Sequence, residues 1–315
     1  MQILCPDPSS FSRVGLEFAR RHANLSVLEM GQAEFELEAP GYDAVLVRFN
    51  TRVGEQAMRG RRLKAVLSPT TGLDHIDLRA ARRNEVRVYH LQGQRRFLSE
   101  ISATAELTIA LMLAVLRRIP QAFDAVKRGN WKPGLLQGHE VYGKTLGIVG
   151  CGRLGKKVAK VGRALGMHVV VFDPFIKRLP AGVVHSPSLQ NLLSCSDVVS
   201  LHVPLSVETT HMISRQELDY IKTGAVLINT SRGAIVNSDS LLFALETKKL
   251  AAAAVDVVEN EWLIEQRVPH PLVDYARTHS NLLITPHIGG ATFESIEKTD
   301  LFILKKYFRD QKIHF

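Results

Sequence analysis

Short apolar runs alternate with helical patterns through almost the whole chain, and this alternation restricts the possible folds more than any other feature. Strand-like runs in the first hundred residues lie at 1–5, 25–29, 43–49, 63–68 and 86–91. Strands that helices cover on both faces are short and apolar throughout, so the pattern predicts parallel sheets in an α/β protein.

A second alternating series follows a long helical segment. The apolar segment 102–118 is expected to be a largely buried helix with Ser102 at its N-cap and Pro120 ending it. A Gly- and Pro-rich loop or arm occupies 127–144. Further strand-like runs lie at 145–150, 168–173, 197–203, 225–230, 252–257 and 282–287. With 315 residues, the chain is expected to form two α/β domains.

The turn after the first of these later strands carries the pattern GxGxxG, at Gly150, Gly152 and Gly155. A strand-like run precedes the turn, a helical pattern follows it, and the next strand-like run ends at Asp173. This context is typical of a dinucleotide site. Gly150 permits the tight turn, Gly152 lets the backbone approach a pyrophosphate, and Gly155 lets the helix pack on the strand. The N–H groups at the start of the helix attract the anion.

Asp173 indicates which dinucleotide is bound. Its carboxylate is expected to accept hydrogen bonds from the adenosine ribose and to repel a 2′-phosphate, which favours NAD over NADP. Lys177 and Arg178 lie near enough in sequence to weaken that preference.

An ionisable residue lies at or just beyond the end of each of the last three strand-like runs: Arg232, Glu261 and His287. The carboxyl ends of parallel strands share one edge, where ligands bind, so these side chains are expected to gather there. Singly, each has a structural interpretation, as a surface ion pair, a solvated loop residue or a hydrogen-bonded histidine. Arg232 is the most informative, because its neighbours are small or apolar and Gly233 is expected to let a ligand come close.

Together the three side chains supply the groups that reduction of a keto acid needs. One cation holds the carboxylate and polarises the carbonyl, and one acid delivers a proton. Histidine changes protonation near neutral pH, and a neighbouring carboxylate favours its protonated form. We therefore expect Arg232 to bind a substrate carboxylate.

The charge of the chain does not require a nucleic-acid partner. The formal net charge is +9, with basic runs at 19–22, 59–64 and 79–85. These runs fall in helical patterns without interleaved aromatic residues, so a solvated basic surface is predicted.

Cysteine usage and apolar stretches predict a cytoplasmic protein. Cys5, Cys151 and Cys195 form no CxxC pair, so neither a disulfide framework nor a metal site is expected. Apolar stretches such as 107–116 are too short to cross a bilayer, and the N-terminus has no basic leader.

The motifs resemble those of the D-isomer-specific 2-hydroxyacid dehydrogenase family, in the same order and over nearly the whole chain. LGIVGCGRLG (146–155) is similar to the family's nucleotide signature, and IKTGAVLINTSRGAIVN (221–237) to its arginine signature. AAAAVDVVENE (251–261) is similar to the stretch that carries its aspartate and glutamate, and ITPHIGGAT (284–292) to the stretch that carries its histidine.

The resemblance implies the architecture. It implies two Rossmann/flavodoxin-like parallel-sheet domains with a cleft between them that closes during turnover. The substrate domain would comprise residues 1–98 and 291–315, and the NAD-binding domain residues 99–290. A homodimer is also implied, with the long helix and the arm at about 102–142 as its interface.

The resemblance also implies roles for individual residues. Arg232 would orient the substrate, His287 would donate and accept the proton, and Glu261 would pair with His287. The N–H groups of Thr71 and Gly72 would form a small nest for the substrate carboxylate. His202 would line the cofactor crevice and not act as a second base. The implied dinucleotide contacts are Thr104, Gly150, Gly152, Arg153, Leu154, Gly155, Asp173, Pro174, His202, Val203, Pro204, Thr209, Asn229, Thr230, Ser231, Arg232, Asp256, His287, Gly289 and Gly290.

Within the family, the segments 47–53 and 104–131 are most similar to the phosphoglycerate dehydrogenase branch. Arg48 is expected to bind a substrate phosphate, and Arg52 is a weaker candidate. The sequence departs from that branch at Ser68, where arginine is common, and near Glu100, where asparagine is common. Trp262 replaces the proline that is usual in the family. Arg95 and Arg96, in the unusual segment 92–100, are alternative phosphate ligands, and no regulatory domain is expected after Phe315.

Several functions therefore remain open. 3-Phosphoglycerate is the favoured substrate, with glyoxylate, hydroxypyruvate or a larger 2-keto acid as alternatives. A non-catalytic NAD-sensing scaffold on the same fold is disfavoured, because the arginine, glutamate and histidine are all present. An NAD-dependent enzyme of related architecture, such as formate dehydrogenase, is also disfavoured, since such enzymes generally have glutamine in the place of Glu261.

Overall fold

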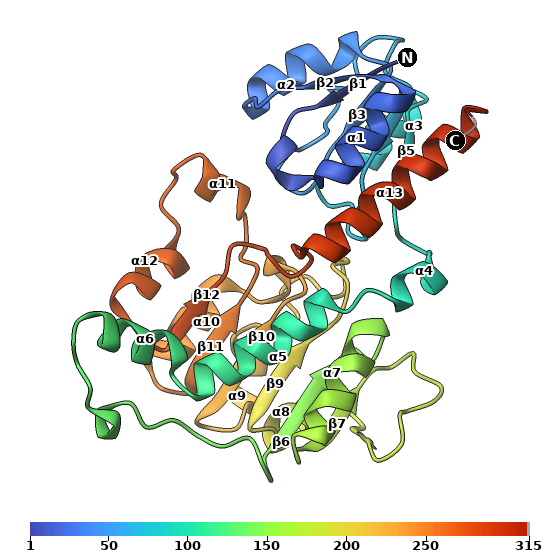
Figure 1. Ribbon diagram of the computed structural model, residues 1–315. Helices are drawn as coiled ribbons and strands as arrows, with labels where there is room; N and C mark the ends of the chain where they lie inside the picture. The colour runs from blue at the N-terminus through green and yellow to red at the C-terminus, as the bar shows by residue number, and fades with distance from the viewer. Residues whose placement is uncertain (314–315) are drawn as a thin grey trace. The chain divides into compact units, whose positions relative to one another are not determined.

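The computed structural model describes residues 1–313, except for the side chain of Glu265. The chain divides into two compact units. Unit 1 comprises Met1–Ile101 and Ala291–Phe315, and unit 2 comprises Ser102–Gly290. Each unit is built on a parallel sheet with helices on both faces (Figure 1). The predicted parallel α/β fold with two sheets is thereby confirmed.

Unit 1 contains a five-stranded sheet in the order β2-β1-β3-β4-β5. Its strands are β1 (Gln2–Cys5), β2 (Asn24–Val27), β3 (Ala44–Leu46), β4 (Ala65–Leu67) and β5 (Arg87–Tyr89). Its helices are α1 (Arg13–His22), α2 (Gln32–Glu38), α3 (Leu78–Arg83), α4 (Arg95–Ser99) and α13 (Phe293–Asp310), with short 3₁₀ turns η1 (Pro8–Ser10) and η2 (Ala39–Gly41).

The apolar strands of unit 1 bury both of their faces. Successive residues of a strand point to opposite sides of the sheet. Ile3 therefore packs with Ile303 and the other core residues of α1 and α13, whereas Leu4 packs with Phe35 of α2 and Ala80 of α3. This double burial is why these strands read as continuous apolar runs.

Unit 2 contains a seven-stranded sheet in the order β12-β11-β10-β9-β6-β7-β8. Its strands are β6 (Thr145–Val149), β7 (His168–Phe172), β8 (Val184–His185), β9 (Val198–Leu201), β10 (Ala225–Asn229), β11 (Leu250–Val255) and β12 (Leu282–Ile284). Its helices are α5 (Ala103–Leu116), α6 (Ile119–Lys127), α7 (Arg153–Ala164), α8 (Leu189–Cys195), α9 (Arg215–Tyr220), α10 (Ser238–Glu246), α11 (Trp262–Glu265) and α12 (Pro271–Thr278), with 3₁₀ turns η3 (Pro133–Leu135) and η4 (Gly233–Ile235).

The order of these strands places a ligand site. The chain runs outward from β6 through β7 to β8, and then returns to β9 on the other side of β6 before it continues to β12. Open α/β sheets bind ligands at the carboxyl ends of the strands where the order reverses. In this sheet the reversal lies between β6 and β9. All strand-like runs expected from the sequence form strands, and the additional strand β8 has only two residues, both exposed.

The long helix differs from its prediction at both ends. The Ser102 side chain does not cap α5; its Oγ instead accepts a hydrogen bond from Lys157 Nζ at 2.6 Å. The helix ends at Leu116, and Arg118 then adopts a left-handed conformation with φ of 53°. Pro120 lies in the first turn of α6, where its missing N–H is harmless, so the prediction that it ends the preceding helix is wrong.

By length and composition alone, the described segment Arg95–Leu116 would be long and apolar enough to cross a membrane. Residues 100–102 interrupt the segment between α4 and α5. Because α5 packs against α7, β10 and β11, we interpret it as a core helix of unit 2 (Figure 1).

Candidate active site

The three glycines of the GxGxxG turn have different structural roles. Gly150 has φ of +89°, and a Cβ on it would lie 2.8 Å from the carbonyl oxygen of His202. A Cβ on Gly155 would lie 2.2 Å from the carbonyl oxygen of Gly150. A Cβ on Gly152 would meet nothing within 4 Å. The first and third glycines thus close the turn, while the second leaves the backbone open at the start of α7, as a bound pyrophosphate requires.

Asp173 fixes this turn from the neighbouring strand. Its Oδ2 accepts a hydrogen bond from Cys151 N at 2.8 Å, and its Oδ1 accepts one from Phe175 N at 2.9 Å. The carboxylate is thereby held beside the glycine turn at the end of β7. Burial raises the pKa of the Cys151 thiol, so the thiol stays protonated and unreactive at neutral pH.

His202 follows β9 and closes the other side of the turn. Its backbone N–H donates to Val149 O at 2.7 Å, and its Nε2 lies 2.8 Å from Ser200 Oγ. Burial lowers the pKa of His202 to about 4. The ring is therefore neutral at physiological pH, which agrees with a lining role and not with proton transfer.

A hydrogen-bonded loop holds Arg232 at the end of β10. Asn229 Oδ1 accepts from Ser231 N at 3.0 Å and from Ser231 Oγ at 2.7 Å, and Asn229 Nδ2 donates to Arg232 O at 2.9 Å. Thr230 Oγ1 lies 2.7 Å from Thr108 Oγ1 of α5. These bonds fix the backbone on both sides of a half-buried guanidinium.

Gly233 does not have the role that the sequence suggested. We expected it to let a ligand approach Arg232. Its missing side chain instead faces the backbone of the next loop, because a Cβ there would lie 2.0 Å from the carbonyl carbon of Val258 and 2.5 Å from Glu259 N. Gly233 therefore lets the loop after β10 pack directly on the loop after β11.

Glu261 and His287 form an ion pair at the ends of β11 and β12. Nδ1 of His287 lies 2.5 Å from Oε1 of Glu261, and both side chains are partly exposed. This contact orients the imidazole ring at the end of β12. It is the arrangement expected of a proton donor and the carboxylate that supports it.

Asp256 organises the loop that carries His287. His287 has φ of +53°, which is unfavourable for a residue with a side chain. Its N–H donates to Asp256 O at 2.8 Å, while the Asp256 carboxylate accepts from Ile288 N at 2.8 Å and from Gly289 N at 2.7 Å. These bonds hold the strained residue, and such strain is typical of functional sites. Burial raises the pKa of Asp256 against the opposing effect of these hydrogen bonds.

Glu259 ties three loops together, and the sequence analysis missed it. One carboxylate oxygen lies 2.5 Å from Nε2 of His211, and the other accepts from Ser238 N at 2.9 Å. The backbone carbonyl of Glu259 lies 2.9 Å from Nε2 of His270. A second carboxylate two residues before Glu261 was the only signal in the sequence, and it gave no indication of these partners.

Unit 2 thus assembles the predicted residues in two groups along one edge of its sheet. The glycine turn, Asp173 and His202 follow β6, β7 and β9. Arg232, Glu261 and His287 follow β10, β11 and β12, which are consecutive neighbours. From the spacing of adjacent strands, the ends of β10 and β12 are about 10 Å apart. The remaining predicted cofactor residues of unit 2 lie at these strand ends or beside them: Thr104 on α5 next to Gly289, Arg153 and Leu154 in the first turn of α7, Pro174 after β7, Val203, Pro204 and Thr209 after β9, and Gly290 after β12.

Arg48, in unit 1, has a structural role that the sequence analysis did not predict. Its Nη2 donates to Asp300 Oδ1 at 2.6 Å and to Thr299 Oγ1 at 3.0 Å, and its guanidinium lies over the ring of Phe11. Burial raises the pKa of Asp300, an effect that Arg48 and Ser12 oppose. The ion pair joins the end of β3 to α13, whereas binding of a substrate phosphate by Arg48 stays a prediction.

Thr71 and Gly72 lie in a loop of unit 1 that is fixed by hydrogen bonds between its own residues. Ser68 Oγ is 2.8 Å from Thr70 Oγ1 and 3.0 Å from Nε2 of His75, and Thr70 Oγ1 donates to Gly72 O at 2.8 Å. Ser68 is fully buried, so it serves the shape of this loop. The carboxylate nest at Thr71 and Gly72 stays a prediction.

Comparison with known proteins places this geometry in a family. Residues 109–289 match the family described as D-isomer specific 2-hydroxyacid dehydrogenase, NAD binding domain. The chain belongs to the D-isomer specific 2-hydroxyacid dehydrogenase family. The resemblance seen in the sequence is thereby confirmed, and the matched residues carry the glycine turn, Arg232, Glu261 and His287.

Relatives in this family differ in length and in the acid that their names specify. A D-3-phosphoglycerate dehydrogenase of Synechocystis sp. is 35% identical over 290 residues, which cover 91% of this chain and 50% of the relative. The chain thus spans about half the length of that relative. A hydroxypyruvate reductase of Thermotoga maritima is 33% identical over 276 residues, which cover 86% and 85% of the two chains. The structure of D-lactate dehydrogenase from Aquifex aeolicus, complexed with NAD and lactic acid, is 28% identical and has a TM-score of 0.83, with 99% and 96% of the two chains covered.

Proposed function

We propose that the chain is an NAD-dependent oxidoreductase that transfers a hydride reversibly between NAD(H) and a small 2-hydroxy or 2-keto acid. The observation that carries the proposal is the 2.5 Å contact of His287 with Glu261 on the sheet edge that also carries the glycine turn and Arg232. Family membership supports the same activity. The open backbone at Gly152 and the anchored Asp173 fit an NAD molecule.

The side chains divide the work of the proposed reaction. When bound, the dinucleotide supplies or accepts the hydride. Arg232 binds the substrate carboxylate and polarises the neighbouring carbonyl. His287 gives its Nε2 proton to the carbonyl oxygen during reduction and takes it back during oxidation. Glu261 engages Nδ1, which directs Nε2 to the substrate and stabilises the imidazolium. The neutral His202 takes no part in proton transfer.

Among the acids named for relatives, we propose 3-phosphoglycerate, with 3-phosphohydroxypyruvate as its keto form. Its phosphate requires a cation in the substrate domain. Arg48 already pairs with Asp300, whereas Arg95 and Arg96 are exposed and, together with Glu100, line a hollow of about 510 Å³ in unit 1. We therefore assign the phosphate to Arg95 and Arg96. Hydroxypyruvate or glyoxylate is the alternative, because the hydroxypyruvate reductase matches this chain over most of both lengths.

The proposal is tested by NADH oxidation with a panel of 3-phosphohydroxypyruvate, hydroxypyruvate, glyoxylate and pyruvate. We expect the highest kcat/KM with the phosphorylated acid. Replacing Arg95 and Arg96 together by Gln should raise KM for that acid only, while the matched pair Arg61→Gln and Lys64→Gln should not. If none of the acids is turned over, the proposed activity is contradicted. If the Arg95 and Arg96 replacement raises KM equally for all the acids, only the assignment of the phosphate is contradicted.

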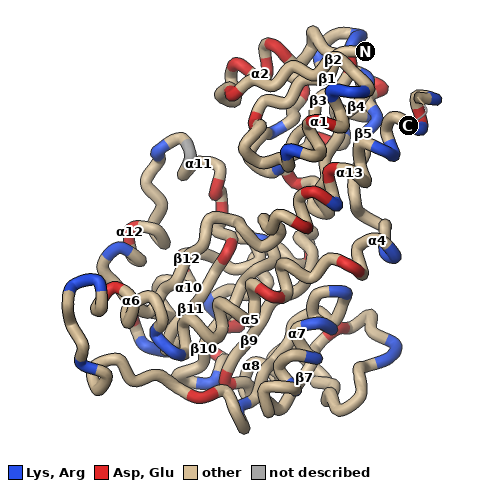
Figure 2. Tube along the Cα trace, viewed as in Figure 1, with Lys and Arg blue, Asp and Glu red and all other residues tan. Residues whose placement is uncertain are grey.

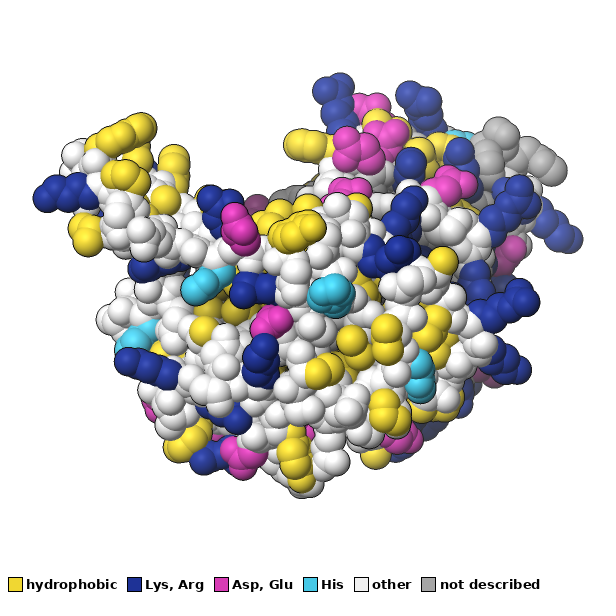
Figure 3. All heavy atoms as spheres, turned by 90° about the horizontal axis from the view of Figure 1, so that it is seen from below, with side chains coloured by type: hydrophobic (Ala, Val, Ile, Leu, Met, Phe, Trp, Pro, Cys, Tyr) yellow, Lys and Arg dark blue, Asp and Glu magenta, His cyan; other side chains and the backbone are white. Residues whose placement is uncertain are grey.

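We further propose that the protein is a cytoplasmic homodimer joined through α6 and the arm at 128–142. Several large apolar side chains of this segment are exposed, among them Phe123, Trp131, Leu135 and Tyr142. Trp131 is 82% exposed and Tyr142 is 78% exposed. Figure 3 shows one face of the molecule, on which hydrophobic side chains, drawn in yellow, are scattered among charged ones. Exposed apolar patches of this kind are typical of protein interfaces.

A further inference from the structure

Unit 2 has a positively charged groove that none of the catalytic side chains lines. It lies between α7 and the loop that follows β7, and it has a volume of about 560 Å³. Its charged lining residues are Lys156, Lys160, Arg163 and Arg178. Figure 2 shows Lys and Arg along α7 and on the loop after β7. The catalytic groups follow β10, β11 and β12 on the opposite half of the sheet, so the proposed proton transfer does not involve this groove, which adjoins the dinucleotide turn at Lys156.

The charges of the groove are not neutralised by the described part of the protein. Neither Asp nor Glu lines it. In the part of the chain that the structure describes, no ion pair involves any of its four cations. Elsewhere on the surface Lys and Arg do pair with carboxylates, as Lys222 does with Asp197 and Arg83 with Glu55. Several like charges along one concave surface attract anions.

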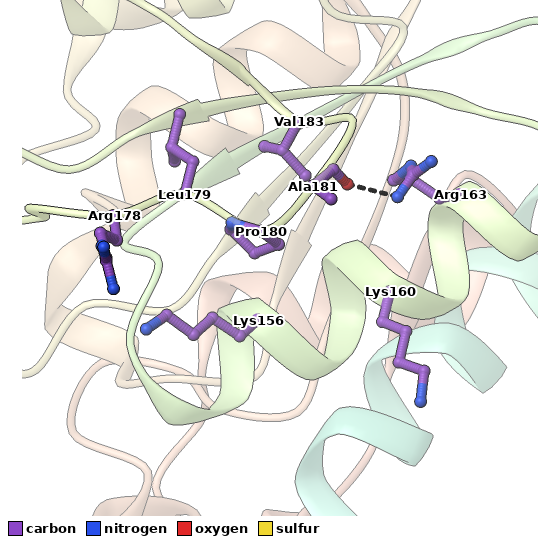
Figure 4. Close-up of a pocket in the computed structure, with 8 residues that line it drawn as sticks. All are labelled: Lys156, Lys160, Arg163, Arg178, Leu179, Pro180, Ala181 and Val183. Atoms are coloured by element: carbon purple, nitrogen blue, oxygen red, sulfur yellow. Dashed lines mark hydrogen bonds between the residues drawn. The ribbon is translucent and has the colours of Figure 1, made fainter.

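The groove has a defined shape. Arg163 Nη1 donates to Ala181 O, drawn as a dashed line in Figure 4. A Cβ on Gly182 would lie 2.4 Å from Cζ of Arg163, and Gly182 has φ of +70°, so the loop is built around this guanidinium. Leu179 and Pro180 of the loop also line the groove, and Figure 4 shows Pro180 opposite Lys156 of α7. The lining therefore combines cations with an apolar wall.

The spacing of the cations indicates the length of the ligand. Lys156, Lys160 and Arg163 recur every three to four residues, so they lie along one face of α7. From the rise per residue, the row is about 10 Å long. Such a row exceeds the size of a single phosphate and suits a chain of phosphates, each of which accepts charge-assisted hydrogen bonds. The fixed carboxylate of Asp173 opposes a 2′-phosphate at the adjoining ribose position, which favours a separate ligand.

We propose that this groove binds an oligophosphate while the dinucleotide site is occupied. The phosphate chain lies along the α7 cations and Arg178. It comes either as a free chain or as part of a nucleoside triphosphate, whose nucleoside would cover Leu179 and Pro180.

Calorimetric titration of the protein with inorganic tripolyphosphate tests the proposal, with saturating NADH present to fill the dinucleotide site. We expect one-to-one binding that weakens as salt is added. Replacing Lys160 and Arg178 by Gln should weaken this binding by about tenfold, because it removes two cations from the groove. Neither side chain holds another part of the structure, so the fold should be kept. The matched variant Arg61→Gln with Lys64→Gln removes the same charge from unit 1 and should bind like the unaltered protein.

Titration with ATP under the same conditions distinguishes the two sources. Tighter binding of ATP than of tripolyphosphate identifies a nucleoside triphosphate, and equal affinity identifies the phosphate chain alone. The proposal fails if neither probe binds when NADH is present, or if both double variants weaken binding equally. Quenching of tryptophan fluorescence by NADH is measured separately, so a failure of the cofactor assignment is distinguishable from a failure of the groove.

Discussion

Nδ1 of His287 lies 2.5 Å from the carboxylate of Glu261, although 26 residues separate the two in sequence. Replacing His287 by Ala should lower kcat for keto-acid reduction by about 10³-fold, within the usual contribution of a general acid, because no group replaces the proton donor. The dissociation constant of NADH should change little. Stopped-flow NADH oxidation and fluorescence titration measure the two quantities.

The partner of the pair is tested by Glu261→Gln, which keeps the shape of the side chain and removes its charge. Because glutamine does not stabilise the imidazolium, the rate of reduction should fall by about 10²-fold. His211→Gln removes a partner of the neighbouring Glu259, so it serves as the control for a loss of rate that comes only from disturbing this loop. Turnover of Glu261→Gln equal to that of the unaltered protein would remove the proposed role of the carboxylate.

Asp173 is predicted to set the preference for NAD over NADP. Its carboxylate also accepts hydrogen bonds from Cys151 N and Phe175 N, so replacement by Ala removes a loop anchor together with a charge. Asp173→Asn keeps one acceptor oxygen and removes the charge. Both variants should bring the kcat/KM values for NADPH and NADH closer together, by about tenfold or more, because the repulsion of the 2′-phosphate is lost. An unchanged ratio in both variants would contradict this role.

Gly233 and Gly152 should respond differently to the same added methyl group. In Gly233→Ala the new Cβ would overlap the backbone of Val258, so we expect a loss of about 1–3 kcal/mol in unfolding free energy and reduced kcat, since the loops of Arg232 and Glu261 shift. In Gly152→Ala the Cβ meets open space, so the stability should be kept while NADH binds about tenfold more weakly. Urea unfolding and fluorescence titration of both variants test the contrast.

The sequence was sufficient for features that depend on local geometry. The glycine turn, Asp173 and the positions of Arg232, Glu261 and His287 at strand ends follow from short-range pattern and from the rule that parallel strands end at one edge. The strands could also be predicted from the sequence, because helices on both faces make each strand apolar along its length.

Features that depend on contacts between residues far apart in sequence could not be predicted from the sequence alone. The position of Ser102 predicts a cap, but its hydroxyl bonds to Lys157, 55 residues away. The sequence gives no sign that the Arg48 guanidinium pairs with Asp300, 252 residues away. The position of Gly233 predicts space for a ligand, but the residue faces Val258 of the next loop. In each case the residue type was informative and its partner was decided by tertiary packing.

His202 should make the stability of unit 2 depend on pH. Burial lowers its pKa from 6.5 to about 4, so between these values the unfolded chain binds a proton that the folded chain does not. The stabilisation is complete above pH 6.5 and is lost as the pH falls toward 4. From pH 7 to pH 5 the unaltered protein should lose about 2 kcal/mol more than His202→Asn.

The measurement is urea unfolding followed by tryptophan fluorescence. Trp131 and Trp262 are the only tryptophans of the sequence, and both belong to unit 2. His185→Asn is the control, because His185 is exposed on β8. If both variants lose as much unfolding free energy as the unaltered protein when the pH falls, His202 does not cause the pH dependence of stability.

The proposed homodimer predicts that charges on the arm will separate the subunits. Replacing Phe123 and Trp131 by Glu places two carboxylates in the proposed apolar interface, where burying them is unfavourable, so sedimentation equilibrium should give the monomer mass. Leu37→Glu is the matched control, because Leu37 is also exposed but lies on α2 of unit 1. It should leave the dimer intact. If the unaltered protein is a monomer at all concentrations, the proposed dimer is contradicted. If the arm substitutions leave the dimer unchanged, the interface lies elsewhere. Because the catalytic pair Glu261 and His287 is complete within one unit, we expect the monomeric variant to keep measurable NADH oxidation.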